Sequence, residues 1–217
     1  MKEIDLVIFD MDGLLFDTET SYYEAMRGAM TTFGFDFPFE TYKSMIGIGD
    51  NETNQLLQKI CGPDFSMAPL WEENYRQFQK LLDEKGLVIK PGAIELLHAL
   101  DEAGIAKCIA SSNNKAAIEN YLEVSGLGDR FDFYVSGDDV KRAKPDPDIF
   151  QIACRKANAT ADRALVLEDS LNGLRAANAA GIKCIIVPDM LEPNEEMKEN
   201  AYAIVDNLEE VIPMVTK

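Results

Sequence analysis

Acidic residues gather directly behind an apolar run near the N-terminus. The segment "LVIFDMDGLLFDTE", residues 6–19, passes from hydrophobic side chains to Asp10, and Asp12 and Asp17 follow closely. Like charges this close repel each other, so the arrangement is costly unless a cation offsets it. In an extended chain, residues i and i+2 point the same way, so Asp10 and Asp12 can face one reacting group. Gly13 allows a tight turn beside them.

Short apolar runs recur along the chain and predict buried strands. These runs are "DLVIFD", "AKCIAS", "FDFYVS", "ALVLED" and "KCIIVPD". Amphipathic segments that end at glycines lie between them, and the segment that follows Ser170 begins with a good N-cap residue. Alternating strands and helices predict an α/β fold with a parallel sheet that is covered by helices on both faces.

Polar residues follow several of these runs at the point where each predicted strand ends. They are Asp10, Ser111, Lys144, Glu168 and Asp169. In an open parallel sheet, ligands bind beyond the carboxyl ends of the strands, so we expect these side chains to gather at one edge. Several carboxylates beside a single amine suit Mg²⁺, which prefers oxygen ligands and often bridges to a phosphate.

One stretch interrupts the alternation. Between Asp17 and about Leu87, helical patterns such as "SYYEAMRGAMTTFG" and "NETNQLLQKICG" replace buried strands. We therefore predict a core domain made of residues 1–16 and 88–217, and an inserted helical domain over residues 17–87. The alternative is that these helices only extend the main core.

The composition excludes several functions. The chain has 217 residues, 47% of them hydrophobic, and its net charge of −17 argues against binding nucleic acid or an anionic membrane through charge. The four cysteines form no Cys-x-x-Cys pair, and no N-terminal apolar stretch is long enough for a signal peptide or a membrane span. With a single histidine, His98, the chain cannot build a multi-histidine metal site. We expect a cytoplasmic monomer.

Four segments together resemble the motifs of the haloacid dehalogenase-like superfamily. "DMDGLLFD" is similar to its D-x-D-G first motif, and Ser111, Lys144 and "EDS" at 168–170 are similar to the second, third and fourth. The resemblance covers essentially the whole chain and is closest to the branch of β-phosphoglucomutase and small sugar-phosphate phosphatases. It implies a Rossmann-like α/β core with an inserted α-helical cap domain.

This resemblance implies a Mg²⁺-dependent phosphatase that hydrolyses a small phosphate monoester. Asp10 would attack phosphorus and form an aspartyl-phosphate. Asp12 would protonate the leaving oxygen and later deprotonate water, and its backbone carbonyl would bind the metal. Asp10, Glu168 and Asp169 would complete the magnesium site.

The resemblance also implies which residues bind the substrate. Ser111, Ser112 and Lys144 would hold the phosphoryl oxygens, and Lys144 would offset their charge. The helical cap would close over the site and exclude water.

Cap residues favour a phosphatase over the main alternative, a β-phosphoglucomutase-type phosphohexomutase. We expect Thr18, Tyr22 and Asp50 to lie near the substrate. In mutase-like sequences, the position of Tyr22 carries a histidine that contacts the general acid/base. Their cap loop that matches "IGIGDNET" supplies an arginine for a second phosphate, and a cap lysine falls near the position of Gln77, which is next to Arg76 here. Here that loop carries Asp50, which would repel a second phosphate.

Two further alternatives have less support in the sequence. A non-catalytic phospho-aspartate signalling or binding module also pairs an aspartate with a Lys-Pro, but such a receiver is much shorter and lacks the insertion. A dehalogenase needs neither the second aspartate, Asp12, nor magnesium.

Overall fold

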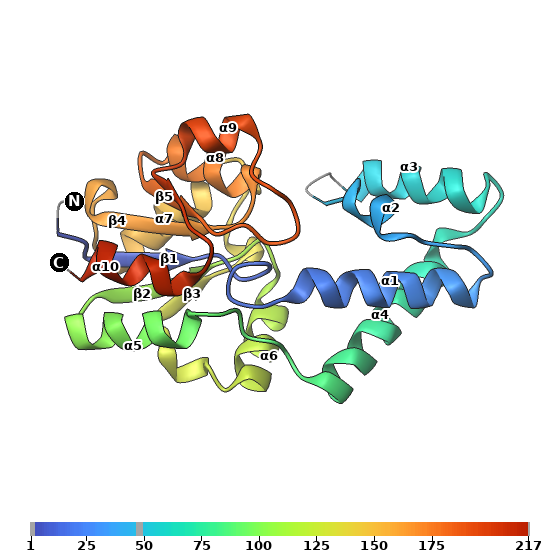
Figure 1. The fold of residues 1–217 in the computed structure, drawn as a ribbon, viewed down its shortest axis with the longest axis horizontal. Coiled ribbons are helices and arrows are strands. Elements are labelled where there is room, and N and C mark those ends of the chain that lie inside the picture. The colour runs from blue at the N-terminus through green and yellow to red at the C-terminus, as the bar shows by residue number, and fades with distance from the viewer. Residues whose placement is uncertain (1–2, 47–49, 217) are drawn as a thin grey trace. The chain divides into compact units, whose positions relative to one another are not determined.

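The chain folds into two compact units. The computed structural model describes residues 3–46 and 50–216 (Figure 1). One unit, called here the sheet unit, comprises Met1–Asp17 and Leu87–Lys217, and the other, the helical unit, comprises Thr18–Gly86. The sheet unit is therefore built from two separate stretches of sequence.

Six parallel strands form the centre of the sheet unit, in the order β3-β2-β1-β4-β5-β6. Their bounds are β1 Leu6–Phe9, β2 Ala106–Ala110, β3 Phe133–Val135, β4 Ala164–Glu168, β5 Lys183–Ile186 and β6 Ala203–Ile204. Each of the five apolar runs contains a strand, which confirms the predicted parallel α/β sheet. The apolar runs did not predict the two-residue strand β6.

Helices cover this sheet. They are α5 Ala93–Ala103, α6 Lys115–Ser125, α7 Asp148–Ala157, α8 Leu171–Ala179, α9 Glu195–Asn200 and α10 Ile212–Val215, with short 3₁₀ turns η1 Gly128–Arg130, η2 Gly137–Asp139, η3 Ala161–Arg163 and η4 Leu208–Val211. Alternate strand residues such as Ile8 and Val166 join Phe150 of α7 and Leu174 of α8 in one buried cluster. This alternation follows from the two-residue period of a strand.

The strand register brings three chain segments to one edge of the sheet. Phe9, the last residue of β1, pairs with Ile109 on one side and Leu167 on the other. Asp10, which follows Phe9, therefore lies between the carboxyl ends of β2 and β4. The polar residues that follow these strands are neighbours because β1 is central.

The helical unit contains α1 Thr18–Thr32, α2 Phe39–Lys43, α3 Asp50–Cys61 and α4 Met67–Lys85. Its own core includes Met26 and Met30 of α1, Leu57 of α3 and Leu70 of α4, with aromatic side chains packed around them. Within the described residues of this unit, no strand is present. None of the helices in the described ranges is long and apolar enough to cross a membrane.

The two connections to the helical unit pair with each other inside the sheet unit. Asp17 N donates to Val88 O at 2.9 Å, and Lys90 N donates to Leu15 O at 2.9 Å. Between them, Phe16 and Ile89 form an antiparallel bridge. These backbone contacts hold the outgoing and returning chain side by side, close to the turn that follows Asp10.

Candidate active site

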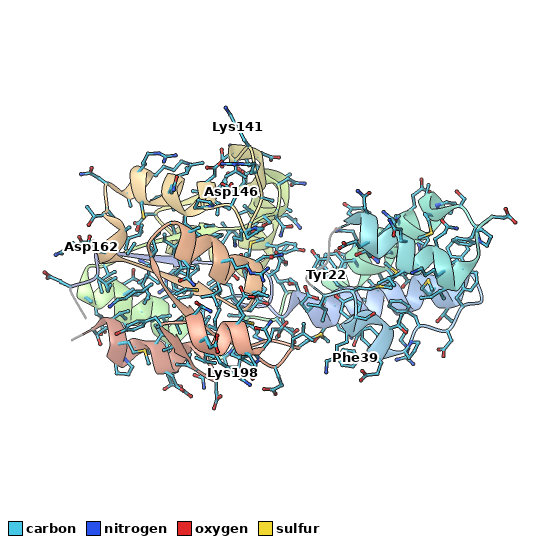
Figure 2. All side chains as sticks on the ribbon, turned by 90° about the horizontal axis from the view of Figure 1, so that it is seen from above. Tyr22, Phe39, Lys141, Asp146, Asp162 and Lys198 are labelled. Carbon is cyan, nitrogen blue, oxygen red and sulfur yellow. The ribbon has the colours of Figure 1, made fainter. Side chains whose placement is uncertain are left out.

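The ammonium group of Lys144 lies among three oxygen acceptors. Its Nζ donates to Asp10 Oδ1 at 2.5 Å, to Glu168 Oε1 at 2.6 Å and to the carbonyl of Ala110 at 3.0 Å. The Phe150 ring lies 5.1 Å from Nζ, and the Lys144 side chain is only 6% exposed. The exposed side chain of Lys141, in the same loop, extends outward instead (Figure 2). Lys144 is therefore a buried cation held by the strand ends.

Glu168 is fully buried and connects Lys144 to the start of α8. Its Oε2 accepts hydrogen bonds from Ser170 Oγ at 2.8 Å and from the amides of Asp169 and Ser170, both at 3.2 Å. Ser170 Oγ in turn accepts from Gly173 N at 3.0 Å and caps the helix, as predicted. One oxygen of Glu168 thus binds the helix N-terminus and the other binds Lys144.

The carboxyl group of Asp10 has a strongly shifted pKa. Burial, followed by the negative charge of Glu168, raises the pKa of Asp10 to about 8, although Lys144 opposes the shift. For Lys144, burial disfavours the charged amine, but Asp10 and Glu168 outweigh this effect and raise its pKa. The surplus of carboxylates makes ionised Asp10 costly unless further positive charge arrives.

Three carboxyl groups converge closely enough to share a cation. Oxygens of Asp10, Glu168 and Asp169 all lie within 4.8 Å of one another. Carboxylate oxygens are hard donors of the kind that Mg²⁺ and Mn²⁺ prefer. Gly13 leaves room for this cluster, because a Cβ there would lie 2.3 Å from Asp169 Oδ2. The cluster therefore fits a divalent cation in donor type and spacing.

Asp12 lies outside that cluster and has a partner that the sequence did not indicate. Asn113 Nδ2 donates to Asp12 Oδ2 at 2.6 Å across 101 positions of sequence. The backbone amide of Asn113 also donates to Ser111 Oγ at 3.1 Å. The "SSNN" segment after the second strand was the available signal, but only the fold shows which of its residues reaches Asp12.

The two serines predicted to bind phosphate with Lys144 differ in burial. Ser111 is buried at the end of β2, whereas Ser112 is exposed. A pocket of about 560 Å³ lies beside them, and its lining includes Ser112, Asn113, Gly137 and Lys144. The structure thus brings Ser111 and Lys144 to the same sheet edge as Asp10.

The three predicted cap residues belong to the helical unit. Thr18 is fully buried at the start of α1. Tyr22 also lies on α1 (Figure 2). It stacks on Phe78 with ring centroids 4.5 Å apart and an interplanar angle of 7°. Asp50 begins α3, but its side chain lies outside the described residues. The functional roles of these residues remain predictions.

Comparison with known proteins identifies the family. A family model described as haloacid dehalogenase-like hydrolase matches residues 7–187. The chain belongs to the haloacid dehalogenase-like hydrolases. The matched range includes all four segments that resemble the family motifs, from Asp10 to Ser170. The predicted family and the predicted fold class are both confirmed.

Relatives within the haloacid dehalogenase-like hydrolases cover nearly the whole chain. Phosphorylated carbohydrates phosphatase from Thermotoga maritima is 31% identical over 208 residues, which are 93% of this chain and 94% of that protein. A crystal structure of mutant CbbY from Rhodobacter sphaeroides, in complex with xylulose-(1,5)bisphosphate, is 28% identical, covers 96% of both chains and has a TM-score of 0.78. β-Phosphoglucomutase from Clostridium difficile is 27% identical over 96% of this chain and 93% of its own, with a TM-score of 0.73.

We predict that Gly173→Ala destabilises the sheet unit. Alanine normally stabilises a helix relative to glycine by about 1 kcal/mol. Here a Cβ would lie 1.9–2.2 Å from the Glu168 carboxyl group, so Glu168 must shift and its contact with Lys144 is disturbed. We expect a loss of about 1–3 kcal/mol, measured by urea or thermal unfolding.

Gly28→Ala in α1 is the matched control for this prediction. Its Cβ would approach only the flexible Gln77 side chain, at 3.3 Å, so we expect no comparable loss. Equal stability of Gly173→Ala and wild-type protein would contradict the tight fit between Glu168 and α8.

We predict that Asp10→Asn makes stability less dependent on pH. In the folded protein the pKa of Asp10 is about 8, so the carboxyl group keeps its proton below that pH. In the unfolded chain an aspartate has a pKa of about 4. The folded state binds the extra proton between these values, so Asp10 lowers stability as pH rises through this window. The Tm advantage of Asp10→Asn over wild-type protein should therefore grow from pH 5 to pH 8 in excess chelator.

The exposed residue Asp206 provides a control for this measurement. Asp206→Asn should shift Tm by a similar small amount at every pH in this range. A constant Tm difference between Asp10→Asn and wild-type protein would show that Asp10 does not titrate in this interval.

Proposed function

We propose that this protein is a Mg²⁺-dependent phosphatase that hydrolyses a small phosphate monoester through an aspartyl-phosphate intermediate. The main support is the Asp10–Glu168–Asp169 cluster beside the buried ammonium group of Lys144. Family membership and the relative named as a phosphatase of phosphorylated carbohydrates point to the same reaction class. A sugar phosphate or a similar metabolite is the substrate class we infer.

The first half-reaction transfers the phosphoryl group to the protein. An oxygen of Asp10 attacks phosphorus, and the bond between phosphorus and the leaving oxygen breaks. Asp12 gives its proton to that oxygen, so the alcohol leaves uncharged. Asn113, which donates to Asp12 Oδ2, orients the carboxyl group for this transfer. Ser111 and Lys144 hold the phosphoryl oxygens, whose charge Lys144 offsets.

The second half-reaction restores the enzyme. Asp12, now ionised, takes a proton from water, and the water oxygen attacks phosphorus. The bond between phosphorus and the Asp10 oxygen breaks, which releases inorganic phosphate and the Asp10 carboxylate. Glu168 does not touch the reacting atoms in this scheme. It acts as a positioning residue that keeps Lys144 at the site.

Asp10, Glu168, Asp169 and the backbone carbonyl of Asp12 are the groups that would hold the cation. Bound there, Mg²⁺ would supply positive charge that favours ionised Asp10 and offsets charge on the transferring phosphoryl group. The pKa of Asp10 near 8 supports this assignment, because its carboxylate needs such a charge at neutral pH.

We propose that the helical unit acts as the cap domain and selects the substrate. The predicted cap residues Thr18 and Tyr22 lie on α1, at its beginning. The division of the chain after Asp17 and after Gly86 supports an insertion of the predicted kind. Closure of such a cap would exclude water that does not take part in hydrolysis.

The similarity to β-phosphoglucomutase keeps a phosphohexomutase as the second candidate. A mutase must hold a bisphosphate, which calls for cations on the cap. Arg76, next to the position where mutase-like sequences carry a cap lysine, already pairs with Glu73 of the same helix, at 2.6 Å. Together with the acidic residue Asp50 at the start of α3, this favours a substrate with one phosphate.

We predict that the purified protein releases inorganic phosphate from members of a panel of phosphate monoesters only when Mg²⁺ is present. Ca²⁺ should inhibit, because it accepts more ligands and can take both oxygens of Asp10. Asp10→Asn should show no turnover, whereas Asp206→Asn should keep wild-type rates. The measurement is phosphate release over the panel with Mg²⁺, with Ca²⁺ and with chelator.

Full activity in excess chelator, or substantial activity of Asp10→Asn, would overturn this proposal. The mutase alternative has its own test, in which β-glucose 1-phosphate is supplied with a catalytic amount of the 1,6-bisphosphate. Glucose 6-phosphate formed faster than phosphate is released would establish the mutase instead.

We predict that Asn113→Ala weakens general acid catalysis. Without the hydrogen bond to Asp12, the rate for an alkyl phosphate should fall about tenfold. The rate for p-nitrophenyl phosphate should change little, since p-nitrophenolate leaves without protonation. Asp206→Asn, at an exposed position outside the motif segments, is the control. Equal losses on both substrates would indicate a merely structural role for Asn113.

A further inference from the structure

Asp189 is a buried carboxylate outside the four motif segments. It follows β5 in the segment "VPDM", residues 187–190. Its Oδ1 accepts a hydrogen bond from Lys90 Nζ at 2.5 Å, and its side chain is only 9% exposed. The other oxygen, Oδ2, is buried and accepts no hydrogen bond. A buried carboxylate oxygen without a donor is unfavourable, so this atom calls for an explanation.

Asp189 Oδ2 lies beside the metal-binding cluster. A Cβ placed on Gly13 would lie 3.4 Å from Asp189 Oδ2 and 2.3 Å from Asp169 Oδ2. The two carboxylates therefore approach the same point of the turn that follows Asp10 and Asp12. Only a glycine leaves that point open, and its φ of +77° also suits glycine.

The nearby cations do not balance this group of acids. Lys90 contacts Asp189 through Oδ1 alone. Lys144 already donates to Asp10, Glu168 and the carbonyl of Ala110. Negative charge therefore remains in excess around Gly13. The water molecules of a hydrated cation would donate the hydrogen bond that Oδ2 lacks, and the cation would supply the missing positive charge.

We propose that Asp189 is an outer ligand of the magnesium site. Its Oδ2 accepts a hydrogen bond from water that is bound to the cation, while its Oδ1 keeps the hydrogen bond from Lys90. This inference rests on the proposed function, because it assumes that the Asp169 cluster holds the cation. With Asp189, the loop after β5 becomes a fifth segment of the proposed site, in addition to the four that carry the family motifs.

Binding of Mn²⁺ tests this proposal without any enzyme assay. Mn²⁺ takes the same oxygen ligands as Mg²⁺, and free Mn²⁺ is measured by electron paramagnetic resonance. We expect Asp189→Asn to bind one Mn²⁺ about tenfold more weakly than wild-type protein, the size of effect typical when a group that hydrogen-bonds to a metal ligand is removed. Asp206→Asn, which removes the same charge from an exposed position, should bind as wild-type protein does.

Lys90→Gln distinguishes an outer ligand from a structural ion pair. It breaks the same ion pair but leaves the Asp189 carboxylate in place, so Mn²⁺ should bind as tightly as to wild-type protein or more tightly. Equal weakening in Lys90→Gln and Asp189→Asn would overturn the proposal, since both would then act through loss of the pair. This variant also carries the test if Asp189→Asn does not fold.

Asp169→Asn separates failure of this inference from failure of the proposed function. If Asp169→Asn loses Mn²⁺ binding while Asp189→Asn keeps wild-type affinity, Asp189 is not an outer ligand and the proposed phosphatase site still stands. If wild-type protein binds no Mn²⁺, or Asp169→Asn binds it unchanged, both the metal site and the role of Asp189 are wrong.

Discussion

A buried ammonium group can be kept charged only by oxygen atoms that surround it, and this requirement organises the sheet unit. Lys144 reaches Asp10 after β1, Glu168 at the end of β4 and the carbonyl of Ala110 at the end of β2. These partners are adjacent only because β1 lies between β2 and β4. The amides of Asp169 and Ser170, directly before α8, then hold Glu168 in place. The strand order therefore allows the side chain of Lys144 to donate to all three chain segments.

The same arrangement leaves negative charge in excess, and this excess is what suits the site to phosphoryl transfer. Asp10 has a raised pKa because its neighbourhood is buried and acidic. A folded chain that needed only stability would replace such a group with an uncharged one. Preorganised charge instead lowers the cost of binding a cation and a phosphate together, because little needs to rearrange when they arrive. The local instability of the site and its proposed reactivity therefore have one physical origin.

Sequence patterns predicted the elements better than the contacts between them. Apolar runs and capping residues such as Ser170 report on short-range order, so the parallel sheet followed from the sequence. The strand β6 did not, since two residues give no periodic signal. The contact of Asn113 with Asp12 and the approach of Asp189 to Gly13 depend on where loops are placed by the whole fold. Loop residues far apart in sequence carry no local signal for such pairing.

The connection between the units and the proposed metal site share residues. Lys90, on the chain that returns from the helical unit, contacts the first motif through its backbone, which donates to Leu15 O. Its side chain contacts the loop after β5 through Asp189. A Cβ on Gly13 would lie 2.3 Å from Asp169 Oδ2 and 3.4 Å from Asp189 Oδ2, so both carboxylates approach the same point of the turn. The segment that returns from the helical unit therefore reaches the proposed metal site through the Lys90–Asp189 pair. In the scheme proposed here, one residue of this connection, Lys90, contacts both the first motif and the outer ligand of the cation site.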